Sequence, residues 1–430
     1  MSLMNPFKSP CELSFKGIAH VETSDNRRRA IVIGIGLLIL GVSGWSGPAL
    51  KAGVRSKMGK DSPPVAHLLE PTGPHKIGTV LYDWTDGARE EQWSATLQAG
   101  RELLVQVWYP TDDIDASRPV PYVPDSDRIR ASLDKDWPEM PLVKTHAAWG
   151  ARLSTARKRY PLLIFSHGMN SARFYYTGLM EELASHGYIV AAIDHTFWGP
   201  GVAFPSGRVV QFEDGMEARD QLSPDEYDQM MWAGVSVMVA DEVFVEHKMV
   251  ELNSNSTAAN LFHNRLNLSQ VGAIGHSMGG YAATRACLEY TVFKACASLD
   301  GLNQFLYLRP TASSKPFLLL LNSASGTQVI SQSLAKRYLA SYGEPRVFIV
   351  DGTKHNSFSD VPILSPVSRA KAPSDPDKAH RVITAELVAF LDRAFGSETS
   401  KSQGIAAPAG LIDVDLRQLA KGKPAGAALQ

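Results

Sequence analysis

The chain has 430 residues, of which 44% are hydrophobic, and its 43 Lys and Arg against 44 Asp and Glu give a formal net charge of -1. This composition allows a large core, in one large α/β domain or in two to three smaller ones. It argues against a nucleic-acid binder, which usually has a basic excess, and against a disordered chain, which is poorer in apolar residues. The three cysteines, Cys11, Cys287 and Cys296, predict neither a disulfide framework nor structural zinc.

The charge is concentrated at the N-terminus, since residues 1–60 hold nine Lys or Arg against three Asp or Glu, a net of +6. Within this segment Arg27–Arg29 precede 21 uncharged residues, Ala30–Leu50. Basic residues followed by an apolar run are typical of an export signal, and the densest part, about ten residues, is shorter than a membrane-spanning helix needs. We predict that residues 1–60 are a cleaved export signal or an uncleaved N-terminal membrane anchor, with a buried core helix as the alternative. The first two interpretations place the rest of the chain outside the cytoplasm, in the periplasm or secreted.

Composition also divides the remainder of the chain. Residues 61–75 are polar and proline-rich, which is typical of a linker. Residues 397–430 are rich in Ala, Gly, Lys and Pro and predict a flexible C-terminal tail, apart from the short stretch Leu411–Leu416. Residues 61–396 are therefore predicted to hold the linker and one folded domain.

Apolar runs of strand length alternate with amphipathic segments of helix length in the folded part. The first two strands, 77–84 and 102–109, are predicted to form an antiparallel pair. Further strands are predicted at 161–165, 188–193, 270–274, 294–299, 316–321 and 346–350. Helices are predicted at 171–186, 223–252, 278–289, 329–342 and 375–395. This alternation predicts an α/β fold with a mainly parallel central sheet and helices on both faces, and such sheets bind ligands at the carboxyl ends of their strands.

A glycine-rich turn joins the strand at 270–274 to the helix at 278–289. Its sequence is Gly275-His276-Ser277-Met278-Gly279-Gly280. A serine between glycines at a strand-to-helix turn is typical of a nucleophile elbow, where side chains at the glycine positions would collide with the neighbouring strand and helix. The motif predicts the α/β-hydrolase fold with Ser277 as nucleophile, and an ordinary tight turn is the alternative.

A nucleophilic serine needs a general base, which follows it in the chain order Ser, acid, His of this fold. Of the twelve histidines, His355 and His380 follow Ser277. His380 lies in the predicted last helix, where a packed or solvated role is expected. His355 lies in the loop after the strand at 346–350, where the catalytic histidine is expected.

The base in turn needs a carboxylate that orients it. Asp300 ends the strand at 294–299, next to the elbow strand, and is the predicted acid. A turn or capping role is its alternative. Asp351 and Asp360 are competing candidates, although Asp351 is so near His355 in sequence that a role in shaping the loop is expected.

Acyl transfer also needs two N–H donors for the developing oxyanion. One is predicted to be the Met278 amide, directly after the nucleophile, and the other the Met169 amide, in the loop after the strand at 161–165. His167 in this loop is expected to shape it through local backbone hydrogen bonds. Candidate walls of the substrate pocket are Tyr175, His195, Trp198 and Phe358, with buried core positions as the alternative.

Five segments together resemble the platelet-activating factor acetylhydrolases of the plasma and intracellular type and their bacterial relatives. These segments are residues 160–168, 275–280, 297–300, 315–323 and 352–358. The family places its acid at the strand after the elbow strand, and Asp300 stands there, 23 residues after Ser277 and 55 before His355. The resemblance covers roughly residues 76–395 and implies a Ser277, Asp300, His355 triad with Met169 and Met278 forming the oxyanion hole. It also implies hydrolysis of short or oxidised acyl esters of phospholipids, with no cofactor or metal.

The sequence departs from the animal members of that family at Asn170, at Met278, where an aromatic residue is usual, and in an insertion around residues 204–222. These departures are expected to reshape the acyl pocket. We predict a serine ester hydrolase that forms an acyl-enzyme on Ser277. The alternatives are a broad carboxylesterase or polyester hydrolase and a non-catalytic exported binding protein; a serine peptidase is disfavoured because no additional domain is found. The expected partners are an ester or phospholipid substrate and a membrane surface, without nucleic acid, and the oligomeric state stays open.

Overall fold

The structure is a computed structural model that describes residues 66–91, 100–113, 119–124, 126–129, 137, 140–211, 222–257, 260–301, 312–324, 330–342, 344–396 and 409–424. The predicted export segment and residues 212–221 of the predicted insertion lie outside these ranges. The backbone divides after Ser62 into two units, and every described residue belongs to the second. Among the described residues, no helix is both long and apolar enough to cross a membrane.

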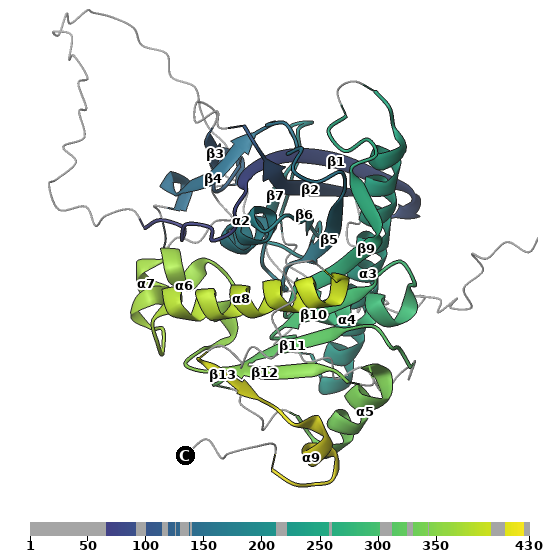
Figure 1. The fold of residues 1–430 in the computed structure, drawn as a ribbon, viewed down its shortest axis with the longest axis vertical. Helices are drawn as coiled ribbons and strands as arrows, with labels where there is room; N and C mark the ends of the chain where they lie inside the picture. Colours follow the sequence, from purple (N-terminus) through teal and green to yellow (C-terminus); the bar gives the residue numbers. More distant parts are fainter. Residues whose placement is uncertain are drawn as a thin grey trace, which may run out of the picture. The chain divides into compact units, whose positions relative to one another are not determined.

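In the described part of the chain, eleven strands form one sheet in the order β13-β12-β11-β10-β9-β5-β6-β2-β1-β4-β3 (Figure 1). The strands from β12 to β6 in this order run parallel, whereas β1 pairs antiparallel with β2 and β2 antiparallel with β6. The bounds are β1 Lys76–Glu90, β2 Gly100–Thr111, β3 Pro119–Pro121, β4 Lys144–Trp149, β5 Tyr160–Ser166, β6 Ile189–Asp194, β9 Leu266–His276, β10 Ala295–Leu299, β11 Phe317–Asn322, β12 Arg346–Val350 and β13 Leu411–Asp413. A separate hairpin pairs β7, Gly201–Ala203, with β8, Val209–Gln211.

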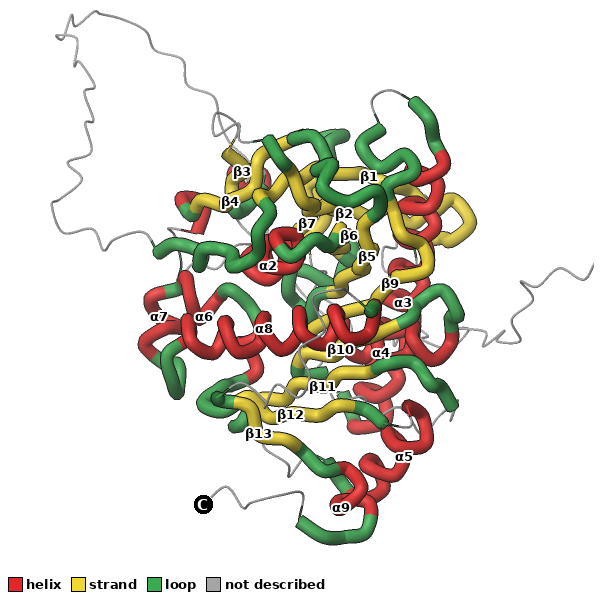
Figure 2. Tube along the Cα trace, in the orientation of Figure 1, coloured by secondary structure: helices red, strands yellow, loops and turns green. Residues whose placement is uncertain are grey.

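Helices cover both faces of this sheet. One apolar cluster packs α3, α4, α5 and α9 against one face, and a second packs α2 and α8 against the other. Figures 1 and 2 show α8 lying across β10, β11 and β12. The bounds are α1 Ser126–Ile129, η2 Met140–Leu142, η3 Arg173–Tyr176, α2 Thr177–Ser185, α3 Pro224–Ser254, α4 Met278–Glu289, α5 Gln332–Tyr342, η7 His355–Phe358, α6 Val361–Leu364, α7 Pro366–Ala370, α8 Pro376–Phe395 and α9 Leu416–Ala420. The predicted mainly parallel sheet with helices on both faces is confirmed.

Local signals explain where several helices begin. Ser223 and Glu226 form a capping box at the start of α3, each side chain satisfying the other residue's backbone N–H. The segment predicted as one helix from residue 171 is instead a 3-10 turn, η3, followed by α2. At α8 the cap is Asp375, whose side chain accepts from the Asp377 N–H.

Two features of the structure add to the sequence predictions. Cys287 in α4 and Cys296 in β10 form a disulfide, a single bond rather than a framework. Within the predicted tail, β13 pairs antiparallel with β12 and α9 packs beside α5. The stretch Leu411–Leu416 thus supplies the edge strand next to β12 and the first residue of α9.

Candidate active site

Ser277 occupies the sharp turn between β9 and α4, with backbone angles φ 54° and ψ -119°. A left-handed φ at a non-glycine residue is uncommon and marks a turn held by its surroundings. The surroundings are tight, because a Cβ on Gly279 would lie 2.2 Å from the Ser166 carbonyl oxygen and one on Gly280 would lie 2.4 Å from Ser298 Oγ. The glycines thus let α4 approach the sheet closely enough to hold Ser277 above it.

Ser277, His355 and Asp300 form a continuous hydrogen-bonded line at the carboxyl ends of the strands. His355 Nε2 lies 2.9 Å from Ser277 Oγ, and His355 Nδ1 lies 2.5 Å from Asp300 Oδ2. Asp300 follows β10, and the Asn322 backbone N–H, at the end of the neighbouring strand β11, donates to Asp300 Oδ1 at 2.8 Å. Burial opposes the ionised form, but the hydrogen bond and the positive charge that His355 can provide lower the pKa of Asp300 below its ordinary value.

The competing candidates lie elsewhere. Asp351 is exposed and accepts from the Gly352 N–H, as expected of a loop-shaping residue. Asp360 is fully buried, its Oδ2 accepting from Tyr122 Oη and the Gly178 N–H, and burial raises its pKa well above the ordinary value. His380 is buried in α8, where burial lowers its pKa to about 4. Only the Asp300 carboxylate is within hydrogen-bond distance of His355 among these acids.

The loop after β5 lies directly against the nucleophile. A Cβ on Gly168 would lie 3.1 Å from Ser277 Cβ. The Gly168 N–H donates to Tyr176 Oη at 3.3 Å, and the Asn170 N–H donates to the Trp198 carbonyl at 2.8 Å. Between them, the Met169 N–H has no hydrogen-bond partner within the described residues. The Met169 N–H is therefore available for a ligand. The Met278 N–H is available too, because Met278 begins α4 and no helical turn precedes it to supply a carbonyl acceptor.

His167, the first residue of this loop, and His195, which follows β6, are both fully buried. His167 Nδ1 donates to the Gly168 carbonyl at 2.7 Å, and its Nε2 accepts from the His195 N–H at 3.1 Å. His195 Nδ1 in turn lies 2.9 Å from Asp241 Oδ2 in α3. Burial lowers the pKa of His167 to about 3, so its imidazole is neutral at physiological pH.

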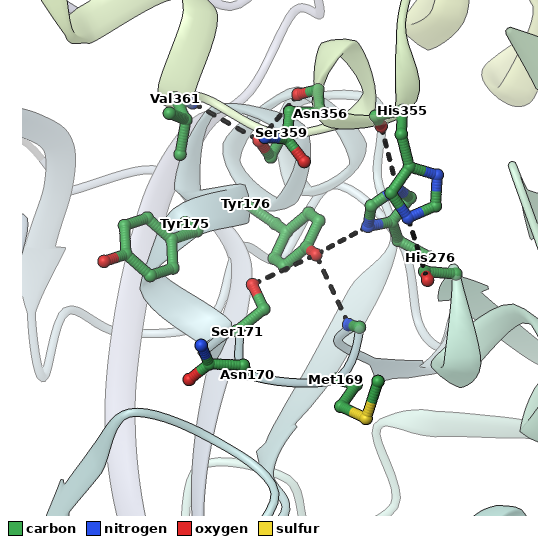
Figure 3. A pocket seen from close by; sticks show the side chains of 12 residues that line it. Met169, Asn170, Ser171, Tyr175, Tyr176, His276, His355, Asn356, Ser359 and Val361 are labelled. Atoms are coloured by element: carbon green, nitrogen blue, oxygen red, sulfur yellow. Dashed lines mark hydrogen bonds between the residues drawn. The ribbon is translucent and has the colours of Figure 1, made fainter. Parts of the chain in front are cut away.

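A cavity of about 190 Å³ opens beside Ser277 and His355 (Figure 3). Its walls come from the loop after β5, from η3, from the turn between β9 and α4, and from the segment that runs from η7 to the start of α6, and they are largely polar. Of the four predicted pocket residues, Tyr175 lines the cavity, whereas His195, Trp198 and Phe358 do not: they are buried in the packed interior. The lining residues are Gly168, Met169, Asn170, Ser171, Tyr175, Tyr176, His276, Ser277, His355, Asn356, Ser359 and Val361.

The cavity includes residues that the sequence analysis did not single out, among them Tyr176 and His276. His276 stands inside the elbow motif, and Tyr176 is adjacent to a residue that was predicted. Ligand atoms of His276, Asp300 and His355 lie within 4.8 Å of one another, a spacing that could hold a metal ion. In this structure both His276 nitrogens and both His355 nitrogens take part in hydrogen bonds within the protein.

The fold and the elbow serine together define the α/β-hydrolase class. A solved structure described as a ferulic acid esterase from Streptomyces cinnamoneus is similar, with a TM-score of 0.64 and 27% identity, covering 81% of this chain and 99% of that one. The family model for platelet-activating factor acetylhydrolase, isoform II, matches residues 66–197 and 240–411. The chain belongs to this family.

Two relatives are named platelet-activating factor acetylhydrolase. The protein from Cavia porcellus is 26% identical over 280 residues, which covers 61% of this chain and 63% of the relative. The protein from Canis lupus familiaris is 26% identical over 287 residues, covering 59% and 61%. The chain thus spans less than two thirds of the length of each of these relatives.

Proposed function

We propose that this protein is a serine ester hydrolase that cleaves short or oxidised acyl esters, including those of phospholipids, through an acyl-enzyme on Ser277. The observation that supports this most strongly is the continuous hydrogen-bonded line from Asp300 through His355 to Ser277. The names of the relatives, platelet-activating factor acetylhydrolases, agree with it.

The mechanism follows from this geometry. His355 Nε2 removes the proton from Ser277 Oγ as the oxygen attacks the ester carbonyl. Asp300 keeps Nδ1 of His355 protonated and stabilises the imidazolium that forms. The N–H groups of Met169 and Met278 bind the oxyanion, and His355 protonates the departing alcohol. A water molecule, deprotonated by His355, then releases the acyl group.

The size of the cavity supports a short acyl group. Sites for drug-sized ligands enclose about 300–1,000 Å³, and the cavity beside Ser277 encloses about 190 Å³. A second candidate is a broad carboxylesterase acting on soluble esters. It is favoured by the polar side chains of the lining and by the similarity to a ferulic acid esterase.

Replacing the nucleophile tests the proposal directly. Ser277→Ala removes the attacking oxygen, so we expect hydrolysis of p-nitrophenyl acetate to fall by at least about 10⁴-fold while the thermal unfolding midpoint stays unchanged. Asp300→Asn should also reduce the rate strongly, since the amide favours the wrong tautomer of His355. Hydrolysis by Ser277→Ala at the unmodified rate would refute the mechanism.

Substrate preference separates the two candidates. We expect kcat/KM for p-nitrophenyl esters to fall as the acyl chain lengthens beyond a few carbons. A 2-acetyl phospholipid, presented in phosphatidylcholine vesicles and as monomers, tests both the phospholipid substrate and the membrane surface as a partner. Cleavage of soluble esters with no cleavage of the phospholipid in either form would favour the carboxylesterase.

We also propose that the protein is exported, its N-terminal segment being a signal or an anchor. The buried Cys287–Cys296 disulfide supports this, because such bonds persist in oxidising compartments. The third cysteine, Cys11, makes the proposal testable by counting thiols after denaturation without a reductant. An exported, cleaved chain has no free thiol and an exported, anchored chain has one, whereas three thiols on a cytoplasmic chain would contradict export.

A further inference from the structure

We infer that Tyr176 and His276 are positioning residues that join the oxyanion loop to the general base through one chain of hydrogen bonds. The inference rests on the proposed function, whose reaction it refines. His276 precedes the nucleophile and lies at the back of the cavity, with Tyr176 on one side and His355 on the other (Figure 3). Its ring centroid lies 4.7 Å from that of His355 and 5.6 Å from that of Tyr176.

The hydrogen bonds of His276 define its tautomer. His276 Nε2 lies 3.0 Å from the His355 carbonyl oxygen, which can only accept, so Nε2 bears the proton. Nδ1 is then an acceptor, and the Tyr176 hydroxyl donates to it at 2.8 Å. Burial, together with the nearby His355, lowers the pKa of His276 to about 3, which keeps the imidazole neutral and the tautomer fixed.

The Tyr176 hydroxyl also receives hydrogen bonds from the opposite side. While its O–H donates a hydrogen bond to His276, the oxygen accepts from the Gly168 N–H at 3.3 Å and from Ser171 Oγ at 3.2 Å. Tyr176 is 1% exposed, and burial raises its pKa to about 12, so the hydroxyl stays protonated. The donors therefore all point one way, from the Gly168 amide through Tyr176 and His276 to the His355 carbonyl.

This chain spans the two halves of the site. Gly168 precedes Met169, whose amide is the proposed oxyanion donor, and His355 is the proposed base. Both must stay in register with Ser277 through the reaction, although they belong to loops that follow different strands, β5 and β12. Aligned hydrogen bonds in a buried site polarise one another, which stiffens the connection. Neither His276 nitrogen is free to take a proton from substrate, so the residue acts through its neighbours.

Tyr176→Phe removes the hydroxyl at the centre of the hydrogen-bond chain and keeps the aromatic ring, whose centroid lies 4.9 Å from that of Phe165. A small displacement of a catalytic group can cost about 100-fold in rate, so we expect kcat for p-nitrophenyl acetate to fall by about 10- to 100-fold, with KM changed by less than about threefold. The matched control is Tyr109→Phe. Tyr109 is also fully buried, and its hydroxyl donates to the Ala151 carbonyl at 2.7 Å. It lies toward the amino-terminal end of the neighbouring strand β6, whereas Ser277 lies at the carboxyl ends of the parallel strands.

A double-mutant cycle tests whether the two residues act as one unit. His276→Asn retains an acceptor near the Nδ1 position but cannot reach the His355 carbonyl. If the chain acts as a unit, Tyr176→Phe/His276→Asn should lower kcat no more than the worse single variant, to within about threefold. The inference would be overturned if the double variant lost kcat by the product of the two single losses. A kcat for Tyr176→Phe equal to that of Tyr109→Phe would also overturn it. Failure of the proposed function would appear differently, as ester hydrolysis that survives Ser277→Ala.

Discussion

His167 is a buried residue whose hydrogen bonds bear on a backbone group rather than on substrate. Its Nδ1 donates to the Gly168 carbonyl oxygen. In a trans peptide the carbonyl and the following N–H point in opposite directions, so this bond also fixes the direction of the Met169 N–H. His167, predicted from the sequence to shape the loop, thereby fixes the direction of the Met169 N–H, the proposed oxyanion donor.

Two substitutions at His167 separate its two hydrogen bonds. The amide of Asn reaches the Nδ1 position and can donate to the Gly168 carbonyl, whereas the amide of Gln reaches the Nε2 position and can bond only the His195 N–H. Losing one oxyanion donor costs about 100- to 1,000-fold in kcat, so we expect His167→Gln to lose about 100-fold and His167→Asn less than about tenfold. Steady-state kinetics with p-nitrophenyl acetate measures both. Equal losses would show that the Gly168 bond does not aim the amide.

At the scale of elements, the positions of Ser277, Asp300 and His355 were predictable because each follows a strand of a parallel sheet. Parallel strands end at one edge, and the Ser, acid, His order then leaves few candidates. The strand pairing confirms that β9, which leads to Ser277, and β10, which leads to Asp300, are neighbours, since Leu299 pairs with His276. Strand order and side-chain identity thus contain most of the information that brings these residues together.

The pocket walls were less predictable, because they depend on how helices pack. A Cβ on Gly234 of α3 would lie 2.2 Å from both Trp198 and Met278, so α3 rests directly on Trp198 and buries it. Nothing in the local sequence of Trp198 indicates this contact with Gly234, which lies 36 residues later in the chain. Phe358 is likewise buried, in the cluster beneath α8. Aromatic residues near a site are placed by tertiary contacts that periodicity alone does not specify.

At the scale of the whole molecule, burial keeps ionisable groups of both signs neutral. Among the described residues, burial lowers the pKa of the buried histidines His167, His195, His276 and His380. The unfolded chain binds these protons near pH 6.5, so the stability that depends on the neutral rings is present above about pH 6.5 and is lost as the pH falls. Burial raises the pKa of Glu242 and Asp360, so the stability that depends on their neutral forms is lost as the pH rises above about 4.

Glu242 is the residue at which the predicted pH dependence of stability can be tested. It is fully buried on α3, where its Oε1 accepts from Ser166 Oγ at 2.6 Å and Asp241 further disfavours its ionised form. Above about pH 7.5 the histidines with lowered pKa values are almost fully neutral in both the folded and the unfolded state. The acids with raised pKa values should then make stability fall as the pH rises, by about 1.4 kcal/mol per pH unit for each proton retained on folding. Glu242→Gln keeps an acceptor for Ser166 and should make that slope shallower by about one such proton.

Urea unfolding of the two proteins between about pH 7.5 and pH 9 measures the difference, with a constant slope of unfolding free energy against urea concentration as the check on two-state behaviour. Glu251→Gln is the matched control, because Glu251 lies on the same helix with its side chain largely exposed beside Lys248. We expect the control to keep the slope of the unmodified protein. A Glu242→Gln variant with that same slope would mean that Glu242 is ionised in the folded protein, and that Ser166 and its surroundings compensate a buried negative charge.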